Sequence, residues 1–272
     1  MHPLVNIAVS AARAAGNLIL RHLDRADQLR VSRKARNDFV SDVDRGAENE
    51  IIAIIHRAYP DHAILAEEGG ARGRSEVVWI VDPLDGTTNF LHRLPHFAVS
   101  IGVQVKGRLD HGVIYAPCTN DLYVASRGGG AQLNNRRIRV SGCTDMDSAL
   151  IGTGVPIDAA NLDAWLPMLR RVVAATAGVR RAGAAALDLA YVAAGRLDAH
   201  WELHLHPWDI AAGIVLVQEA GGIVSEALGG ADPLASGHIL AATPKLHPIL
   251  AGMLAAARET TAKAKQSANE RE

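Results

Sequence analysis

An apolar run that ends in two closely spaced carboxylates constrains this chain most. Residues 79–90 read WIVDPLDGTTNF. The apolar start is typical of a buried strand, and Pro83 is expected to end it because proline fixes φ and donates no hydrogen bond. Asp82 and Asp85 would therefore lie at or just beyond the strand end, on a tight turn that leads toward a helix.

Acidic residues on such a turn suit metal and phosphate chemistry. Mg²⁺ binds carboxylate oxygens, and the backbone N–H groups of Gly86, Thr87 and Thr88 would face an anion such as phosphate. The alternative is an ordinary turn, since Asp, Pro, Gly and Thr are common turn and cap residues. This segment alone leaves both interpretations open.

Composition argues against several other classes of protein. The chain has 272 residues, of which 49% are hydrophobic, enough for one large domain or two closely packed halves. Its net charge of -1 gives no electrostatic reason to expect nucleic acid or a membrane as a partner. Cys118 and Cys143 form no CxxC pattern, so neither a disulfide framework nor a zinc knuckle is indicated. We therefore expect a cytoplasmic protein.

The first apolar segment predicts a core helix rather than a signal peptide or a membrane span. Arg13 interrupts the stretch Leu4–Leu20, and no basic region precedes it. Apolar residues recur there at the helical period, at Leu4, Ile7, Ala8, Ala11, Ala15 and Leu18. Farther on, Arg30–Arg36 is a basic patch, for which a solvated surface is the default interpretation.

Helical and strand patterns alternate along the rest of the chain. We expect helices up to about residue 59 and at 161–177, 185–194, 210–220 and 246–258. Strands are expected at 63–66, 77–81, 97–106, 112–116, 122–126, 149–152, 196–205, 222–226 and 239–242. The polar segment before Glu76 is expected to be a mobile loop, Asn134-Asn135 a hairpin turn, and Gly128–Gly130 a turn rather than a P-loop.

This alternation, with two antiparallel-looking stretches, predicts an α/β layered sandwich of two pseudo-domains with the site between them. The N-terminal half would comprise residues 1–142 and carry most metal ligands. The C-terminal half would comprise residues 143–258. Residues 259–272 are polar and are expected to form a disordered tail.

Two further acidic positions resemble the first pair in their placement. Asp209 lies at the start of a strong helical pattern, where it would serve merely as an N-cap. Glu67 and Glu68 follow a short strand and would be merely solvated. Glu67, Asp82, Asp85 and Asp209 nevertheless all fall at element boundaries, where functional side chains are usually displayed. One shared site is a simpler explanation than four coincidences.

These residues also carry a resemblance to a known family. Over nearly its whole length the chain resembles the inositol monophosphatase family, particularly its bacterial members. The matching segments are Ala66-Glu67-Glu68, Asp82–Thr88, Trp208-Asp209 with Ala211–Gly213, Arg181–Ala186 and Trp201-Glu202. The resemblance implies an αβαβα sandwich of the sugar-phosphatase type, a homodimer, and inhibition by lithium.

The resemblance also implies a set of ligands for two or three Mg²⁺ ions. Glu67, Asp82 and the backbone carbonyl of Leu84 would hold one ion, and Asp82, Asp85 and Asp209 a second, with Asp82 bridging. Glu67 would also reach a third, weaker ion. Thr87, hydrogen-bonded toward Asp44, would orient and deprotonate the attacking water. This agrees with paired-metal chemistry, in which the ions acidify water and stabilise the attacking and leaving oxygens.

On the substrate side, the resemblance assigns the phosphate to the N–H groups of Gly86 and Thr87. It assigns the inositol hydroxyls to Asp85, Gly183, Ala185 and Glu202. A carboxylate such as Glu202 accepts two hydroxyl hydrogen bonds, a natural way to bind a polyol. The alternative for Glu202 is an exposed strand residue without a role in binding.

Three histidines, His200, His204 and His206, lie two or four residues from Glu202. On a continuous strand all four side chains would share one face, and such a group would suggest zinc. Packing or hydrogen bonding near the dimer interface or the site entrance is the preferred interpretation, because Glu202 has a better explanation.

The sequence therefore predicts a Mg²⁺-dependent phosphomonoesterase that acts on inositol 1-phosphate. One alternative keeps this chemistry but changes the substrate to histidinol phosphate, a sugar bisphosphate or a phosphoadenosine nucleotide, the last being disfavoured. An alternative of another class is a regulator that binds RNA or a transcription partner through the patch Arg30–Arg36, although the sequence does not favour nucleic acid.

Overall fold

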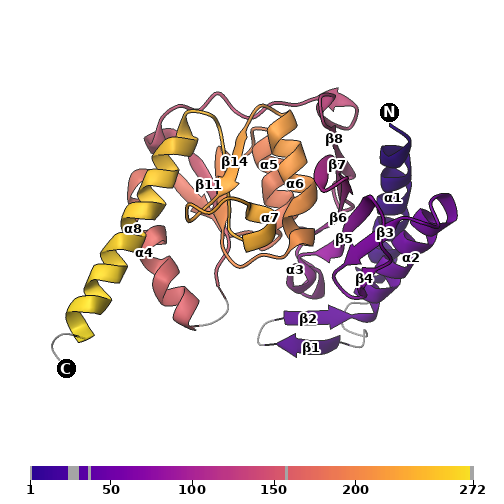
Figure 1. Ribbon diagram of the computed structural model, residues 1–272, viewed down its shortest axis with the longest axis horizontal. Coiled ribbons are helices and arrows are strands. Elements are labelled where there is room, and N and C mark those ends of the chain that lie inside the picture. The colour runs from indigo at the N-terminus through magenta and orange to yellow at the C-terminus, as the bar shows by residue number, and fades with distance from the viewer. Residues whose placement is uncertain (1, 24–30, 36–37, 157–158, 270–272) are drawn as a thin grey trace.

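The protein is a stack of five layers of alternating helices and sheets (Figure 1). The computed structural model describes the backbone of residues 2–23, 31–35, 38–156 and 159–269, and the side chains within these ranges except those of 31–41, 159–160 and 259–269. The order of layers is helix, sheet, helix, sheet, helix, which confirms the predicted αβαβα sandwich.

The N-terminal half forms two of the layers. Helices α1 (Pro3–Leu23) and α2 (Asp42–Ala58) cover a sheet of eight strands in the order β10-β9-β8-β7-β6-β5-β3-β4. The strands are antiparallel except for the parallel pair β3–β5. Their bounds are β3 Ala63–Ala66, β4 Gly70–Arg72, β5 Val77–Asp85, β6 Ala98–Val105, β7 Arg108–Ala116, β8 Asp121–Ser126, β9 Gly130–Leu133 and β10 Arg136–Arg137. A separate hairpin pairs β1 (Val31–Ala35) with β2 (Asp38–Ser41), and α3 (Thr87–Leu91) follows β5.

The C-terminal half supplies the other three layers. A mixed sheet has the order β12-β11-β13-β15-β14, with β11 Leu150–Thr153, β12 Gly178–Arg180, β13 Ala199–Glu202, β14 Ile223–Glu226 and β15 Ile239–Ala242. Helices α5 (Ala185–Ala193) and α6 (Pro207–Glu219) lie between the two sheets, and α4 (Ala159–Ala175) and α8 (Leu246–Asn269) form the outer layer. Two short helical turns, η2 (Met146–Ser148) and α7 (Pro233–Ser236), complete this half.

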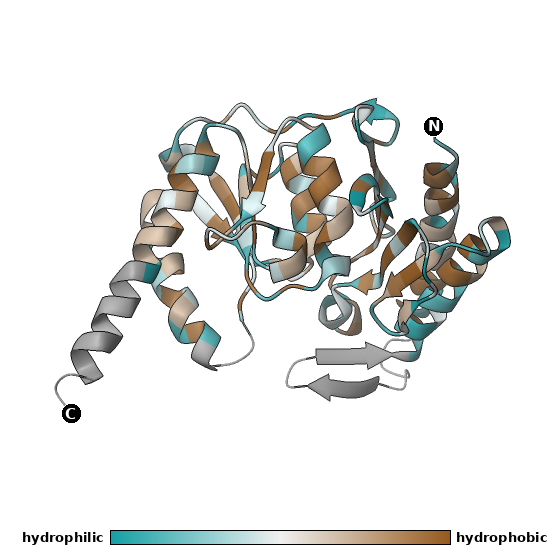
Figure 2. Cartoon of the chain, viewed as in Figure 1, coloured by the Kyte–Doolittle hydropathy of each residue, from teal (hydrophilic) through white to brown (hydrophobic). Residues whose placement is uncertain are grey.

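The middle layer joins the halves through a shared apolar core. Ile114 and Tyr123 of the large sheet belong to the same buried cluster as Leu189 of α5, Leu216 of α6 and Ala241 of the second sheet. Figure 2 shows this pattern as hydrophobic colour on the central helices and strands. The two halves therefore share one of the three apolar cores, and the predicted division at residue 142 stays a prediction.

Helix α6 approaches the large sheet so closely that two strands carry glycine beneath it. A Cβ at Gly112 of β7 would collide with the backbone of Ala212, and a Cβ at Gly102 of β6 would lie 2.7 Å from the Cβ of Ala211. Backbone atoms give way less readily than side chains. These two glycines therefore set the distance between α6 and the sheet.

The substitution Gly112→Ala should lower the free energy of unfolding by about 1–3 kcal/mol, because the added methyl overpacks a rigid backbone contact. Chemical denaturation measures this change. Gly142→Ala is the matched control, since a Cβ there meets no atom within 4 Å, and its effect should stay within about 0.5 kcal/mol. Equal effects of the two substitutions would contradict the packing argument.

Helix α1 is confirmed as the predicted amphipathic core helix. By length and composition it is apolar enough to cross a membrane. In the fold, however, its buried residues, including Val5, Ala12 and Ile19, belong to a core cluster, and the helix contacts α2, β6 and β7. This placement is typical of a core helix of a globular domain.

Several predicted boundaries were wrong for identifiable reasons. Strand β13 ends at Glu202 rather than at residue 205, because His204 adopts a positive φ of 62°. The loop before Glu76 contains β4, whose residues have no apolar alternation to reveal it. Helix α8 continues to Asn269, past the expected end at 258. Residues 259–269 include three Ala and two Lys, which favour helix.

Candidate active site

Strand β5 passes through both acidic residues of the first motif instead of stopping at Pro83. Its register with β6 pairs Asp82 with Ser100 and Asp85 with Ala98, and it is irregular in between. A bulge tolerates proline because no ladder hydrogen bond is required of it. The Leu84 N–H instead donates to Asp82 Oδ1 at 2.9 Å. The expectation that Pro83 ends the strand is therefore wrong. The strand continues through an irregularity to Asp85.

The residues after Asp85 form the predicted turn into a helix. Gly86 has φ 91° and ψ 37°, a left-handed conformation that favours glycine, and α3 begins at Thr87. The Thr87 hydroxyl lies 2.8 Å from Asp44 Oδ1 and 3.1 Å from the Leu84 carbonyl oxygen. Its single proton can be donated to only one of them at a time. The predicted Thr87–Asp44 contact is present, and Asp44 is buried on the first turn of α2.

Glu67 is held beside β5 by backbone contacts. It follows β3 directly, and its N–H donates to the Val81 carbonyl at 3.2 Å. The next residue, Glu68, donates its N–H to Glu48 Oε2 at 2.8 Å, and Glu48 is buried on α2. Glu48 was not predicted from the sequence, although its spacing of four residues from Asp44 places both on one face of a helix.

Asp209 reaches the same region from the C-terminal half. It lies in the first turn of α6, where its Oδ2 accepts a hydrogen bond from the His206 N–H at 2.7 Å. His206 is the N-cap, so Asp209 closes a capping box rather than serving as the cap itself. The Ser100 hydroxyl of β6 donates to the Trp208 carbonyl at 3.3 Å. This contact ties the start of α6 to the strand beside Asp82.

The four predicted acidic ligands share one electrostatic environment. Burial raises the pKa of Asp82, and the charges of Glu67, Asp85 and Asp209 raise it further. Burial and the charge of Asp209 likewise raise the pKa of Asp85. For Asp209, burial first and then the charges of Glu67 and Glu202 raise the pKa to about 7. The largest charge effects on these three groups come from other carboxylates, which therefore repel one another.

Such a donor set fits a hard divalent cation. Carboxylate oxygens and a backbone carbonyl are its usual ligands, and a dication relieves the repulsion among buried acids. Within the described ranges, no three His, Cys, Asp or Glu side chains have the spacing of a preformed metal centre. The acidic side chains are therefore neighbours whose arrangement a cation would complete, rather than a closed site of the structural kind.

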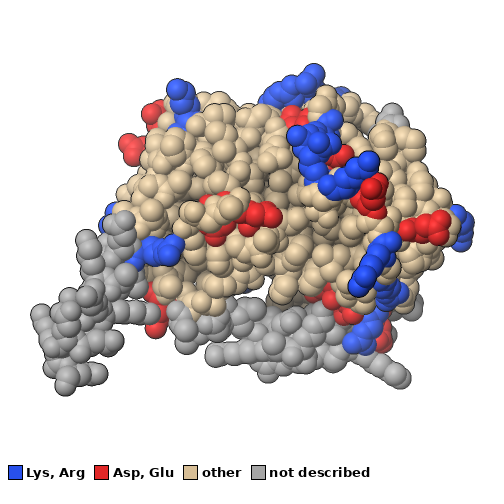
Figure 3. Space-filling model, viewed as in Figure 1, with Lys and Arg blue, Asp and Glu red and all other residues tan. Residues whose placement is uncertain are grey.

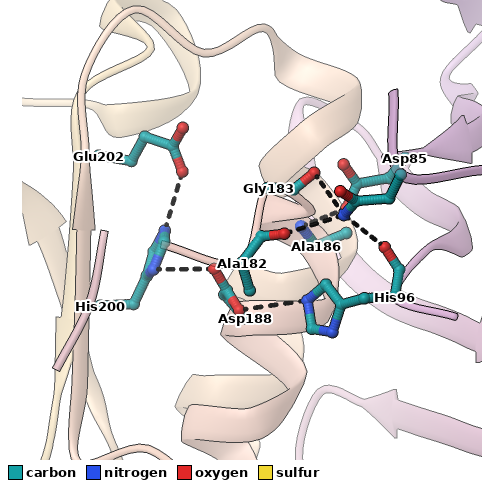
Figure 4. A network of polar contacts seen from close by, with 9 residues as sticks. Asp85, His96, Ala182, Gly183, Ala186, Asp188, His200 and Glu202 are labelled. Carbon is teal, nitrogen blue, oxygen red and sulfur yellow. Dashed lines mark hydrogen bonds and ion pairs between the residues drawn. The ribbon is translucent and has the colours of Figure 1, made fainter. Parts of the chain in front are cut away.

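The segment before α5 lies against the other side of Asp85. The Ala186 N–H donates to Asp85 Oδ2 at 2.8 Å. The Asn89 amide group donates to the carbonyl oxygens of His96 at 2.7 Å and Ala182 at 2.8 Å. Figure 4 shows Asp85, His96, Ala182 and Ala186 near Gly183, one of the predicted substrate contacts. Asn89 was not predicted from the sequence, and it links α3 to Ala182 of the proposed substrate segment, 93 residues later.

The remaining predicted substrate residues border the same region. Ala185 is the first residue of α5, and Gly183 has a positive φ of 84° just before it. Glu202 ends β13, and its charge raises the pKa of both Asp85 and Asp209. The fold thus brings Gly183, Ala185 and Glu202 of the C-terminal half toward Asp85 of the N-terminal half.

The three histidines do not share a strand face. His200 is fully buried on β13, His204 is exposed after the strand has ended, and His206 caps α6. No zinc-like cluster involving them occurs among the described residues. The parity argument for zinc fails because β13 is too short to carry it. The backbone N–H of His204 donates to His238 Nδ1 at 3.1 Å. Packing or hydrogen bonding of the histidines near the dimer interface or the site entrance stays a prediction.

Comparison with known proteins agrees with this geometry. The family model described as "Inositol monophosphatase family" matches residues 1–262. The Nus factor SuhB of Pseudomonas aeruginosa is 54% identical over 254 residues, covering 90% of this chain and 93% of that protein. The extragenic suppressor protein suhB from Bartonella henselae superposes with a TM-score of 0.91 at 44% identity, covering 93% of this chain and 98% of that one.

A solved structure that is named for the enzyme activity matches as well. The inositol monophosphatase from Anabaena (Nostoc) superposes with a TM-score of 0.83 at 38% identity, covering 92% of this chain and 94% of that one. The names Nus factor, extragenic suppressor protein and inositol monophosphatase therefore all occur among relatives that match this chain over nearly its full length. The chain belongs to the inositol monophosphatase family.

Proposed function

We propose that this protein is a Mg²⁺-dependent phosphomonoesterase that hydrolyses inositol 1-phosphate to inositol and phosphate by attack of an activated water. Membership of the family supports a phosphatase. The observation that carries the proposal is an acidic cluster beside the Thr87–Asp44 pair, in which burial and the charges of Glu67, Asp85 and Asp209 raise the pKa of Asp82. We further propose a cytoplasmic homodimer that is inhibited by lithium.

The metal would be held by the acidic side chains and one carbonyl group. Glu67, Asp82 and the Leu84 carbonyl would bind one Mg²⁺, and Asp82, Asp85 and Asp209 a second. Glu67 would also reach a third ion. When bound, Mg²⁺ would offset the phosphate charge and acidify the attacking water.

The remaining groups of the site would orient the reacting parts. The Asp44 carboxylate accepts from the Thr87 hydroxyl, so the threonine oxygen keeps its lone pairs available for a proton of the attacking water. The N–H groups of Gly86 and Thr87 would bind the phosphate. Glu202, Gly183 and Ala185 would contact the inositol ring, with Asp85 serving both the metal and the substrate.

Phosphate release from D- and L-inositol 1-phosphate, with Mg²⁺ and with a chelator, tests the proposal. We expect turnover that requires Mg²⁺ and a kcat/KM above those for histidinol phosphate and fructose 1,6-bisphosphate, because a ring polyol satisfies Glu202 best. Metal-dependent turnover of another ester alone would discard the substrate and keep the chemistry. If folded protein that binds Mg²⁺ released phosphate from none of these substrates, the result would contradict the enzyme assignment.

A second candidate function is regulation of transcription, which the name of the Pseudomonas aeruginosa relative supports. The patch Arg30–Arg36 that would bind RNA or a protein partner lies partly outside the described residues, and its side chains are not described. On the face shown in Figure 3, basic and acidic side chains are interspersed. Loss of partner binding after neutralising Arg33, Lys34 and Arg36 would support this function, and unchanged, salt-insensitive binding would remove the patch from consideration.

A further inference from the structure

His200 occupies an unusual position for a titratable side chain. It lies on β13, between β11 and β15, and its side chain is 0% exposed. Its Nε2 is 3.3 Å from Glu202 Oε2, and its Nδ1 is 3.8 Å from Asp188 Oδ2. Neither ring nitrogen has a hydrogen-bond partner among the described residues. Figure 4 shows the ring between the two carboxylates.

A carboxylate near each nitrogen determines the charge that the ring should carry. Both neighbours are acceptors, so both nitrogens are best matched when each carries a proton. Burial lowers the pKa of His200, but Glu202 and Asp188 outweigh burial, and the pKa is raised overall. A cationic ring also offsets the charge of Glu202, which raises the pKa of both Asp85 and Asp209.

The chain segment beside β13 leaves room for the side chains of both His200 and Glu202. Gly152 of β11 lies opposite His200, and a Cβ there would be 2.8 Å from His200 Nδ1. Two residues later, a Cβ at Gly154 would collide with the Glu202 carboxylate. The segment Gly152–Gly154, at the end of β11 and just beyond it, thus lies beside His200–Glu202 of β13. The absence of side chains at both glycines fixes where the imidazole and the carboxylate can lie.

Asp188 is the carboxylate near the other ring nitrogen of His200. It is buried on α5, and its Oδ1 is 3.6 Å from His96 Nε2. Two residues earlier on the same helix, the Ala186 N–H holds Asp85. The helix therefore supports Asp85 through its backbone and His200 through a side chain.

We propose that His200 is a positioning residue that holds the Glu202 carboxylate toward the bound polyol and thereby sets substrate preference. This inference rests on the proposed role of Glu202 in binding hydroxyl groups. His200 itself is buried behind Glu202, whose side chain is 20% exposed, so the histidine acts through the carboxylate and not on the substrate.

Steady-state kinetics of His200→Gln on two substrates tests the proposal. For inositol 1-phosphate, we expect kcat/KM to fall roughly tenfold, mainly through KM, because the carboxylate loses a charged partner. For p-nitrophenyl phosphate, which has no hydroxyl groups to bind, the change should stay below about twofold. His204→Gln is the matched control, since His204 is exposed just after the same strand, and it should leave both substrates unaffected.

A double-mutant cycle separates positioning from general damage to the fold. In a Glu202→Gln background, His200→Gln should have little further effect, because the group that it positions has been changed. Additive effects, an equal loss on both substrates, or no loss on either would overturn the proposal. Should His200→Gln fail to fold, Gly152→Ala displaces the ring without removing it and should give the same selective loss, while an unselective loss would overturn the proposal.

A crystal structure of the His200→Gln variant decides the inference without relying on turnover. Rotation of the Glu202 carboxylate away from its wild-type position supports the positioning role, and an unchanged carboxylate overturns it. If wild-type protein hydrolyses p-nitrophenyl phosphate but no polyol phosphate, the proposed substrate fails. In that case the crystal structure still shows whether His200 fixes Glu202.

Discussion

Replacing Asp82 by asparagine should abolish Mg²⁺-dependent phosphate release and, in the absence of metal, make the protein more stable to heat. Burial and the charges of Glu67, Asp85 and Asp209 all raise the pKa of Asp82, so a charge at this position costs folding free energy. An asparagine oxygen can still accept the Leu84 N–H that Asp82 Oδ1 accepts at 2.9 Å. Relief of about 1 kcal/mol would raise Tm by about 2–4 °C.

The loss of activity should be far larger than this change in stability. A carboxylate proposed to bridge two cations contributes to binding both, so we expect kcat/KM to fall by at least about 10³-fold. Wild-type protein should also gain about 2.7 kcal/mol of stability at Mg²⁺ concentrations near 100 times Kd. The variant should show little of this gain.

Calorimetry with a chelator and with saturating Mg²⁺, beside the phosphate-release assay, measures both effects. Asp147→Asn on η2 is the matched control, because Asp147 is an exposed aspartate remote in sequence from the acidic motifs. The control should change neither Tm nor activity. An Asp82→Asn variant that keeps its Mg²⁺-dependent turnover would remove this carboxylate from the proposed metal site.

The stability of the metal-free protein should fall as the pH rises from about 4 to above 7. The pKa of Asp209 is raised from 3.8 to about 7, first by burial and then by the charges of Glu67 and Glu202. A group with a raised pKa binds its proton more tightly in the folded state. Its contribution to stability is therefore complete below the unfolded pKa and is lost as the pH rises through the folded pKa. One such group accounts for up to about 4 kcal/mol.

Mg²⁺ should reverse this trend. Because the cation competes with protons for the carboxylates, the increase in Tm caused by Mg²⁺ should grow as the pH rises through about 7. Melting temperatures across that range, for wild-type protein and Asp209→Asn with and without metal, isolate the contribution of this residue. A wild-type curve that runs parallel to that of Asp209→Asn in the absence of metal would show that Asp209 ionises with an ordinary pKa.

The sequence predicted the fold well where apolar periodicity was strong. Helix α1 and strands β6, β8 and β15 occur close to their expected ranges, because each has a regular apolar face or a continuous apolar run. The short strands β4 and β12 were missed, since three residues are too few to show a period. The predicted strand end at Pro83 was wrong because a bulge can hold a proline that a regular ladder excludes.

The proximity of the acidic residues was easier to predict than the contacts that support them. Glu67, Asp82, Asp85 and Asp209 stand in recognisable motifs, and the fold brings their charges together. Glu48, Asn89 and Asp188 act through long-range contacts, such as the bond from Asn89 to Ala182 across 93 positions. No local pattern encodes such a contact. It becomes visible only when the layers are assembled.

The five-layer order separates two tasks that the site must perform. Strand β5 carries Asp82 and Asp85, α2 carries Asp44, and α3 begins with Thr87. Glu202 lies instead on β13, in the second sheet. Substitutions in the second sheet can therefore alter which alcohol is accepted without disturbing the groups proposed to cleave the ester. A scaffold divided in this way allows substrate specificity to evolve while the groups proposed to cleave the ester stay unchanged.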